Sequence, residues 1–242
     1  MEKYGLVKGL QELKGRGITV ASLTTDRHPG IKKHMRLHEP DTEHKFDIWH
    51  VAKGLKKKLS AECKRASCAP LRDWVGPIVN HLYWCVAISK GDGKLVVAIW
   101  KSMLNHVINV HDGHDKPYSR CLHDELPDGK WLMPGTPAYA RLVAVATNNL
   151  LLRDMEKLSA TGQTSSLESY HSLLIKFAPK SVGYTPRTMR ARTQLAALHQ
   201  NENSNRSHAA TKDGNGKYKR KNPRAQPGKE VVGLVKTPPT YG

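Results

Sequence analysis

Residues 20–59 read VASLTTDRHPGIKKHMRLHEPDTEHKFDIWHVAKGLKKKL, and their pattern alternates between strand-like and helix-like segments. The β-branched and apolar residues from Ile18 to Thr25 predict a buried strand, which Asp26 ends. Pro29 suits the first turn of a helix. The segment predicts four elements in turn: a strand at 18–25, a helix at 30–37, a strand at 46–49 and a helix at 50–59. This alternation is typical of α/β folds with a parallel sheet.

The flanking segments extend this unit mainly with helices. Leu6, Leu10 and Leu13 recur at helical spacing and predict an amphipathic helix at 2–14. Further helices are predicted at 71–87, 94–110, 138–157, 165–177 and 188–201, with a loop at 111–137. We interpret four tryptophans as core anchors rather than base-stacking residues: Trp74, Trp84, Trp100 and Trp131. The expected fold class is therefore α/β and α-rich.

The pattern divides the chain into four expected parts. They are the first part of an α/β core at 1–60, a helical insertion at 61–160, helices completing the core at 161–201, and a basic tail at 202–242. The tail is rich in Asn, Gly, Pro and Lys. Such a composition is typical of a disordered segment.

The composition excludes several classes of protein. The chain has 242 residues, with 39 Lys and Arg against 21 Asp and Glu, and a formal net charge of +18. No run approaches the roughly 18 apolar residues of a membrane span, and the N-terminus lacks the apolar segment of a secretory signal. The four cysteines are too few for a disulfide scaffold. The charge favours a polyanionic partner, most simply nucleic acid, and we expect neither secretion nor membrane contact.

Acidic residues stand where α/β folds place their sites. Asp26 follows the first predicted strand, Asp47 and His50 lie near the second, and Glu168 opens a later helix within the segment QTSSLESYH at 163–171. Carboxylates that hold two Mg²⁺ ions can promote phosphoryl transfer. Each residue also has an ordinary structural interpretation. Asp26 is suited to cap a helix, Glu168 to favour a first helical turn, and His50 to begin a helix as a polar residue.

This layout resembles the catalytic domain of DDE-type transposases, most closely the Mutator-like group and related bacterial insertion-sequence transposases. The resemblance covers residues 1–200 and implies an RNase H-like core interrupted by a helical insertion. Asp26 would be the second catalytic acid, with the Asp-x-x-His element of Asp47 and His50 beside it. Glu168 would be the third acid. The implied cofactor is Mg²⁺ or Mn²⁺, bound by Asp26 and Glu168, and intact relatives would cut and join DNA strands.

One part of the family pattern is missing. The first acid of the family lies on a strand that would precede the helix at 2–14, and only Met1 stands before that helix. The sequence thus predicts an incomplete, N-terminally truncated RNase H-like core with an incomplete catalytic site. Two alternatives stay open, a non-catalytic DNA- or chromatin-binding module and a gene fragment without an activity of its own.

Two basic clusters are the predicted DNA contacts. The first lies on the helix at 50–59 and the second in the tail: Lys53, Lys56, Lys57 and Lys58, then Lys219, Arg220 and Lys221. Such residues neutralise backbone phosphates, and the tail cluster also resembles a nuclear-import signal. DNA is therefore the expected partner, the nucleus is the expected location, and a homo-oligomer is a further assembly to test.

A second constellation lies inside the predicted insertion. It comprises His106, His111, His114, Cys121 and His123, whose imidazole and thiolate groups suit tetrahedral Zn²⁺, and the candidate ligands are His106, His111, Cys121 and His123. The spacing is not that of a standard zinc finger, and chance clustering is a real alternative in a chain with 13 His. The sequence predicts a structural zinc site here as one of two interpretations. The pair Cys63 and Cys68 is better explained as reduced helix cysteines.

Overall fold

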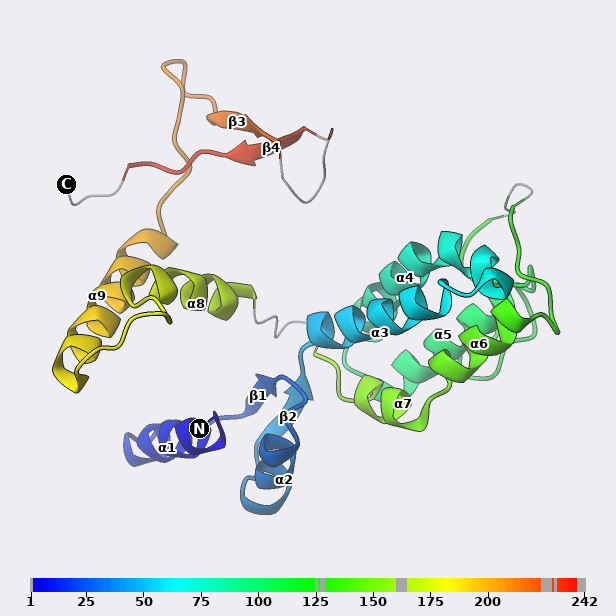
Figure 1. The fold of residues 1–242 in the computed structure, drawn as a ribbon, viewed down its shortest axis with the longest axis horizontal. Helices are drawn as coiled ribbons and strands as arrows, with labels where there is room; N and C mark the ends of the chain where they lie inside the picture. The colour runs from blue at the N-terminus through cyan, green and yellow to red at the C-terminus, as the bar shows by residue number, and fades with distance from the viewer. Residues whose placement is uncertain are drawn as a thin grey trace. The chain divides into compact units, whose positions relative to one another are not determined.

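A computed structural model describes residues 2–124, 126, 129–159, 165–222, 228 and 230–238. The chain divides into two compact units, Met1–Thr164 (unit 1) and Ser165–Gly242 (unit 2). The described residues are α-rich and carry two small two-stranded sheets, as Figure 1 shows. None of their helices combines the length and apolar character needed to cross a membrane.

Unit 1 begins with the expected alternation of helices and parallel strands. Its first elements are α1 (Glu2–Gly15), β1 (Ser22–Thr25), α2 (Pro29–His38), β2 (Glu43–Phe46) and α3 (Ile48–Glu62). The two strands pair in parallel, with Ser22 opposite Glu43 and Thr25 opposite Phe46. On the other side of β2, Phe46 forms a parallel bridge with Leu158. The α/β prediction is thus confirmed at the level of a short parallel sheet, while an RNase H-like core stays a proposal.

The prediction of a strand at 46–49 was wrong by about three residues. The Asp47 side chain accepts a hydrogen bond from the Trp49 amide at 2.8 Å and so caps α3. The helix therefore starts at Ile48, and its buried face begins there. The strand lies before the cap, and most of its side chains are polar, so its sequence lacks the apolar, β-branched pattern by which strands are predicted.

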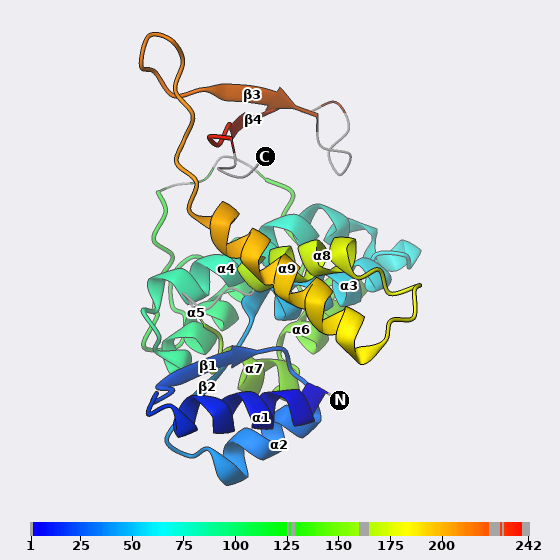
Figure 2. The same ribbon diagram turned by 90° about the vertical axis from the view of Figure 1, so that its left-hand side faces the viewer.

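A small apolar cluster covers one face of the β1–β2 pair. It joins Leu10 of α1 to Ile31 and Met35 of α2, with Leu23 of β1 packed against them. Figure 2 shows α1 and α2 beneath the two strands. The spacing of leucines in the first helix predicted this face through Leu6 and Leu10, whereas Leu13 of the same predicted stripe is exposed.

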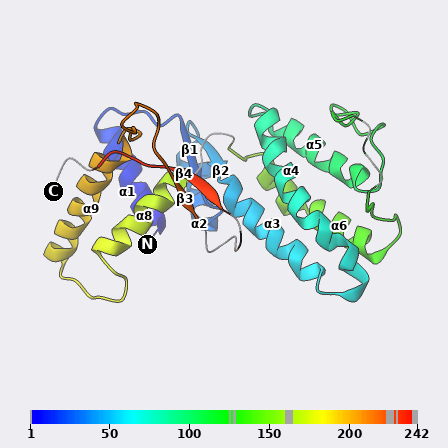
Figure 3. The ribbon, with the colours of Figure 1, turned by 90° about the horizontal axis from the view of Figure 1, so that it is seen from above.

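The main core of unit 1 lies in its helical part. It contains α3, η1 (Ala66–Trp74), α4 (Val75–Ile88), α5 (Gly93–His106), α6 (Pro137–Ala146) and α7 (Asn149–Met155). Helix α3 packs against α4 and α6, and α4 packs against α5, as Figure 3 shows from above. Several side chains in this core have at most 1% of their surface exposed: Leu59, Leu71, Ile78, Leu82, Trp100 and Leu142.

The structure changes several boundaries of the predicted helices. The helix expected at 138–157 is two helices, because the Asn148 side chain accepts hydrogen bonds from two amides and starts α7 anew. The tryptophan prediction is confirmed for Trp100, whose indole Nε1 donates to the Ala146 carbonyl at 2.9 Å. Trp84 instead keeps 37% of its surface exposed.

Unit 2 consists of a helix pair and a hairpin-like sheet. Helices α8 (Ser165–Phe177) and α9 (Pro186–Ser204) pack against each other, and β3 (Tyr218–Lys221) pairs antiparallel with β4 (Val231–Leu234). The tail was expected to lack a fold, and the structure differs in containing this sheet. Every residue of β3 is exposed, so backbone pairing rather than a core holds it. The composition of the tail therefore could not predict this sheet, because composition predicts buried cores and not backbone pairing.

Candidate functional site

The four His and Cys residues of the insertion are brought together by a helix end and a folded loop. His106 is the last residue of α5. The loop beyond it doubles back, with the Cys121 amide donating to the His111 carbonyl at 2.8 Å and Asp112 bridging Arg120. His111 and Cys121 thus lie opposite each other, like partners in a β-hairpin.

Asn109 makes the sharp turn between α5 and this loop. Its φ of 62° lies in the left-handed region, which asparagine tolerates better than most residues. The Val110 amide then returns to the Asn105 carbonyl at 3.0 Å and closes the helix end. The side chain of Asn109 also acts on the cluster, because its Oδ1 lies 2.9 Å from Nε2 of His111.

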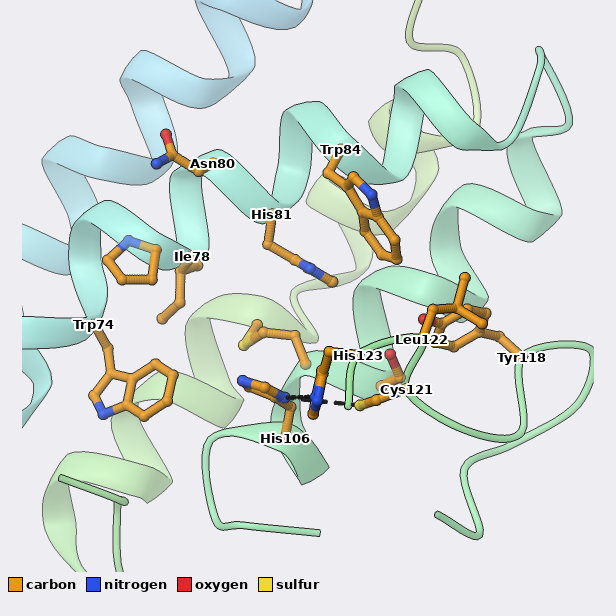
Figure 4. A pocket seen from close by; sticks show the side chains of 13 residues that line it. Trp74, Ile78, Asn80, His81, Trp84, His106, Tyr118, Cys121, Leu122 and His123 are labelled. Carbon is orange, nitrogen blue, oxygen red and sulfur yellow. Dashed lines mark hydrogen bonds between the residues drawn. The ribbon is translucent and has the colours of Figure 1, made fainter. Parts of the chain in front are cut away.

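The four side chains form one group whose ligand atoms all lie within 4.8 Å of one another. His106 Nδ1 is 3.3 Å from His123 Nε2 and 3.7 Å from Cys121 Sγ. With ordinary zinc bond lengths, a tetrahedron has edges of about 3.3 Å between nitrogens and about 3.6 Å between nitrogen and sulfur. Figure 4 shows the side chains of His106, His123 and Cys121 turned toward one another. The cluster has the donors and the spacing to hold a metal ion.

Hydrogen bonds outside the cluster determine which nitrogens face inward. If Nε2–H of His111 donates to Asn109, the lone pair stays on Nδ1, and this Nδ1 is buried without a hydrogen-bond partner. In His123, Nδ1 lies 2.7 Å from the Asp124 carbonyl, which only an N–H can satisfy. The remaining Nε2 then presents a lone pair to the cluster. Such outer hydrogen bonds orient metal-binding histidines.

His114 supports Cys121 from outside the group. The Asn105 amide nitrogen lies 3.0 Å from His114 Nδ1, which can only accept, so Nε2 carries the proton. That Nε2 is 3.3 Å from Cys121 Sγ and can donate to it. His114 is 6% exposed, and sequence spacing left it outside the predicted ligand set. The feature of the sequence that pointed to His114 was its position in the same histidine-rich loop as His111 and His123.

The surroundings favour the neutral form of two cluster histidines, His106 and His111. Burial, together with the neighbouring histidines, lowers the pKa of His106 to about 4. Burial also lowers the pKa of His111 and of His114, while it raises the pKa of the Cys121 thiol, with Asp112 adding to the rise. Neutral imidazoles offer their lone pairs to a metal at neutral pH, and the thiol must lose its proton when a cation binds.

Two tryptophans and a hollow flank the cluster. The rings of His106 and His111 lie 5.8 Å and 5.5 Å from the Trp131 ring, and Trp74 packs against Trp131 and donates to the Lys130 carbonyl. On another side, a mostly apolar hollow of about 480 Å³ opens between α4, α5 and the loop (Figure 4). The walls exclude water from part of the cluster, which strengthens electrostatic interactions within it.

The acids of the proposed transposase site lie at the carboxyl end of the parallel strands. Asp26 follows Thr25 and Asp47 follows Phe46, and these two preceding residues are register partners. Asp26 is exposed, and its Oδ1 accepts from the His28 amide at 3.1 Å. Asp47 is 1% exposed and caps α3. The structure therefore brings Asp26 and Asp47 to one sheet edge and gives both a local structural role.

The remaining predicted residues divide between the units. His50 is half-buried on α3 with its ring 4.8 Å from that of Trp49. Glu168 is exposed in the first turn of α8, which belongs to unit 2, so its pairing with Asp26 stays a prediction. Gln163 and Thr164 of the same segment lie outside the described residues. The three basic residues of the tail lie on β3 and are exposed: Lys219, Arg220 and Lys221.

The four lysines of the first basic cluster are exposed residues of α3, and Lys53, Lys56 and Lys57 share one face of it. All are exposed, while the opposite side of the helix is buried through Val51, Leu55 and Leu59. Trp49 joins this surface with 41% of its area exposed, and the Lys53 ammonium lies 4.5 Å from its ring centroid. We call this surface the lysine face of α3, comprising Trp49, Lys53, Lys56, Lys57 and Lys58. Its exposed aromatic residue was missed from the sequence.

A buried carboxylate was also missed. Asp154 of α7 has 3% of its side chain exposed and pairs with Arg27 at 3.1 Å and with Lys32 at 3.0 Å. These contacts join residues more than 120 positions apart, so no local pattern could signal them.

The chain matches no protein-family model and has no significant match among curated proteins or solved structures.

Proposed function

We propose that the chain is a transposase-derived DNA-binding protein that contacts backbone phosphates through the lysine face of α3. The observation that carries this proposal is the exposure of Lys53, Lys56 and Lys57 at helical spacing on one side of α3, whose other side is buried in the core, with the exposed Lys58 about 100° further round the helix. Among the described residues, none of the four forms an ion pair that would neutralise it. Free ammonium groups on a fixed helix are suited to phosphates, and a DNA role agrees with the expected nuclear location.

Trp49 adds an aromatic element to the same surface. Proteins that bind single-stranded nucleic acid combine cationic grooves with exposed aromatic rings on which bases stack. The Lys53 ammonium over the Trp49 ring holds that indole at the surface. We therefore include Trp49 in the proposed interface.

The test is DNA binding by the full chain in increasing salt. Lys53, Lys56 and Lys57 are replaced together by Gln, and the matched control replaces Lys8, Lys94 and Lys101, three exposed lysines on α1 and α5. The slope of log affinity against log salt should decrease by about 2.7 in the first variant, at about 0.9 for each phosphate that is no longer neutralised. Equal slopes in both variants would contradict the proposal.

We also infer that the His/Cys cluster holds Zn²⁺ as a structural ion. The donor set of three imidazoles and one thiolate suits Zn²⁺ better than Mg²⁺, which prefers oxygen. A metal-free cluster leaves His111 Nδ1 buried with no partner, and an unpaired buried polar atom costs about 1–3 kcal/mol. Four protein ligands close the coordination sphere, as in structural sites rather than catalytic ones.

The zinc proposal predicts one ion per chain. Untagged protein, purified without chelators, is analysed for metal by mass spectrometry and then loaded with Co²⁺, whose visible absorption reports tetrahedral thiolate ligation. His106→Ala should lose the metal, and His38→Ala, at an exposed histidine on α2, should keep it. Protein that binds Co²⁺ only with an octahedral spectrum would contradict the proposal.

A second candidate function is metal-dependent cleavage of DNA by a remnant catalytic site. The observation that favours it is the placement of Asp26, exposed, beside Asp47 at one sheet edge, where α/β folds place their sites. Nicking of supercoiled DNA with Mn²⁺ tests it, using Asp26→Ala and Glu168→Ala. Cleavage that persists unchanged in both variants would remove these residues from the site, and DNA binding without cleavage would favour a non-catalytic module.

A further inference from the structure

A second basic surface of unit 1 was not foreseen from the sequence. A hollow of about 1130 Å³ lies between α2, β2, the start of α7 and the segment that follows α7. We call it the basic groove. Seven of its lining residues are basic and three are acidic. The basic ones are Arg27, Lys32, Lys33, Arg36, Lys45, Lys58 and Lys157, and the acidic ones are Glu43, Asp154 and Glu156.

Ion pairs neutralise only part of this charge. Buried Asp154 holds Arg27 and Lys32, and Glu43 lies 3.3 Å from Lys45. Within the described part of the chain, four other cations of the groove form no ion pair: Lys33, Arg36, Lys58 and Lys157. The groove therefore carries three cations held in ion pairs and four that form none among the described residues.

The pKa of a histidine in the groove lining agrees with this excess of positive charge. His44 of β2 lines the groove, and its Nε2 lies 2.8 Å from Thr25 Oγ1. Burial lowers the pKa of His44, and the nearby Lys157 and Lys32 lower it further. The groove thus disfavours an additional cation and favours an anion.

We infer that the basic groove binds the phosphodiester backbone of DNA and continues the lysine face of α3. Lys58 is an exposed residue of α3 and also lines the groove, so the basic cluster of α3 and the groove adjoin at this residue. The free cations are spread along a hollow far larger than one phosphate group, which fits a polymer of phosphates better than a single small anion. This inference rests on the proposed DNA binding and deepens it.

The test compares two double variants of the full chain. Lys33→Gln with Lys157→Gln removes two free cations of the groove, and Lys94→Gln with Lys101→Gln removes two exposed lysines of α5. Both are titrated onto a fluorescent 20-base-pair duplex of mixed sequence. We expect the salt slope to fall by about 1.8 in the groove variant, at about 0.9 per phosphate, and to stay unchanged in the control. Replacing the same two lysines with Arg should preserve binding.

The outcomes distinguish a failure of the groove inference from a failure of the proposed DNA binding. If the parent chain fails to bind the duplex, the proposed function itself is wrong. If the parent binds and the groove variant retains its affinity and salt slope, the groove inference alone is overturned. Inorganic phosphate at constant ionic strength provides a further arm. Full displacement of the duplex by millimolar phosphate would show a small-anion site and would also overturn the inference.

Discussion

The two candidate sites of unit 1 hold their polar side chains in opposite ways. At the strand edge, Asp26 and Asp47 each accept a hydrogen bond from a backbone amide two residues later. In the His/Cys cluster, His111 Nδ1 is buried with no partner. The strand-edge carboxylates are thus satisfied by the protein alone. The cluster has the donors to hold a cation, which we propose completes it, and the predictions below test this difference.

The largest expected effect is the loss of a cluster ligand. His111→Ala removes the buried Nδ1 and should weaken zinc binding more than about 100-fold, beyond the effect of a typical outer-sphere change. Competition with a chromophoric chelator measures the affinity, and His38→Ala is the control. If His111→Ala binds zinc as tightly as the parent, the cluster is not the site and the comparison fails.

Removing the buried carboxylate should have the next largest effect. Asp154→Ala leaves Arg27 and Lys32 without their shared partner, and we expect the free energy of unfolding to fall by about 3 kcal/mol. Urea denaturation measures it. Asp154→Asn keeps the shape and an acceptor, and should lose less. No change in Asp154→Ala would mean that these ion pairs contribute nothing to stability.

A substitution at Asn109 tests whether a hydrogen bond that orients His111, which is not itself a bond to the metal, affects zinc affinity. Asn109→Gly keeps the left-handed turn, because glycine adopts positive φ freely, but removes the acceptor for His111 Nε2. We expect a 10- to 100-fold loss of zinc affinity with an unchanged helical circular dichroism spectrum. Unchanged affinity would show that the outer hydrogen bond does not orient His111.

Of the two strand-edge carboxylates, only Asp47 caps a helix, because the cap of α2 is His28 and Asp26 lies two residues before it. Asp47→Ala should lower the free energy of unfolding by about 1 kcal/mol, whereas Asp47→Asn, which can still cap, should lower it less. Asp26→Ala, at an exposed position, should change it by less than about 0.5 kcal/mol. Chemical denaturation measures all three. A large stabilisation by Asp26→Ala would instead indicate that its carboxylate is held at a cost, as in a functional site.

The smallest effect concerns pH. Burial lowers the pKa of His81 below its ordinary 6.5, while its hydrogen bond with the Ile99 carbonyl opposes this shift. Below pH 6.5 the unfolded chain binds a proton that the folded chain excludes, so stability is full above 6.5 and is lost as pH falls. Unfolding in urea at pH 7.5 and 5.5 should show a smaller loss in His81→Gln than in the parent. Equal losses would contradict this assignment.

Local patterns predicted the elements better than their ends. The leucines of α1 and the apolar face of α3 appear in the sequence because helical burial repeats every three to four residues. The ends of β2 and α7 were missed because Asp47 and Asn148 act as caps, and capping depends on backbone geometry rather than on hydrophobic spacing. The β3–β4 pair was missed because it buries almost no side chains.

In the candidate sites, too, the residue types could be predicted from the sequence but their spatial arrangement could not. The types of residue in the His/Cys cluster could be predicted, since imidazole and thiol ligands are recognisable wherever they occur. The supporting roles of His114 and Asn109 could not, because they depend on which nitrogen of each ring points inward. The basic groove was invisible in the sequence, since its cations come from four separate segments.

The sequence by itself determined the short-range properties of this protein. These are its positive charge, its helical stripes, its parallel strand–helix–strand unit and the ligand types in its insertion, all of which depend on residue identity and near-neighbour spacing. Only the tertiary structure decided that His111, whose Nδ1 is buried without a partner, lies among three other metal-ligand side chains, and that Asp154 meets Arg27 and Lys32. Such juxtapositions arise when a packed core brings distant segments within a few ångströms, and no local periodicity records that distance.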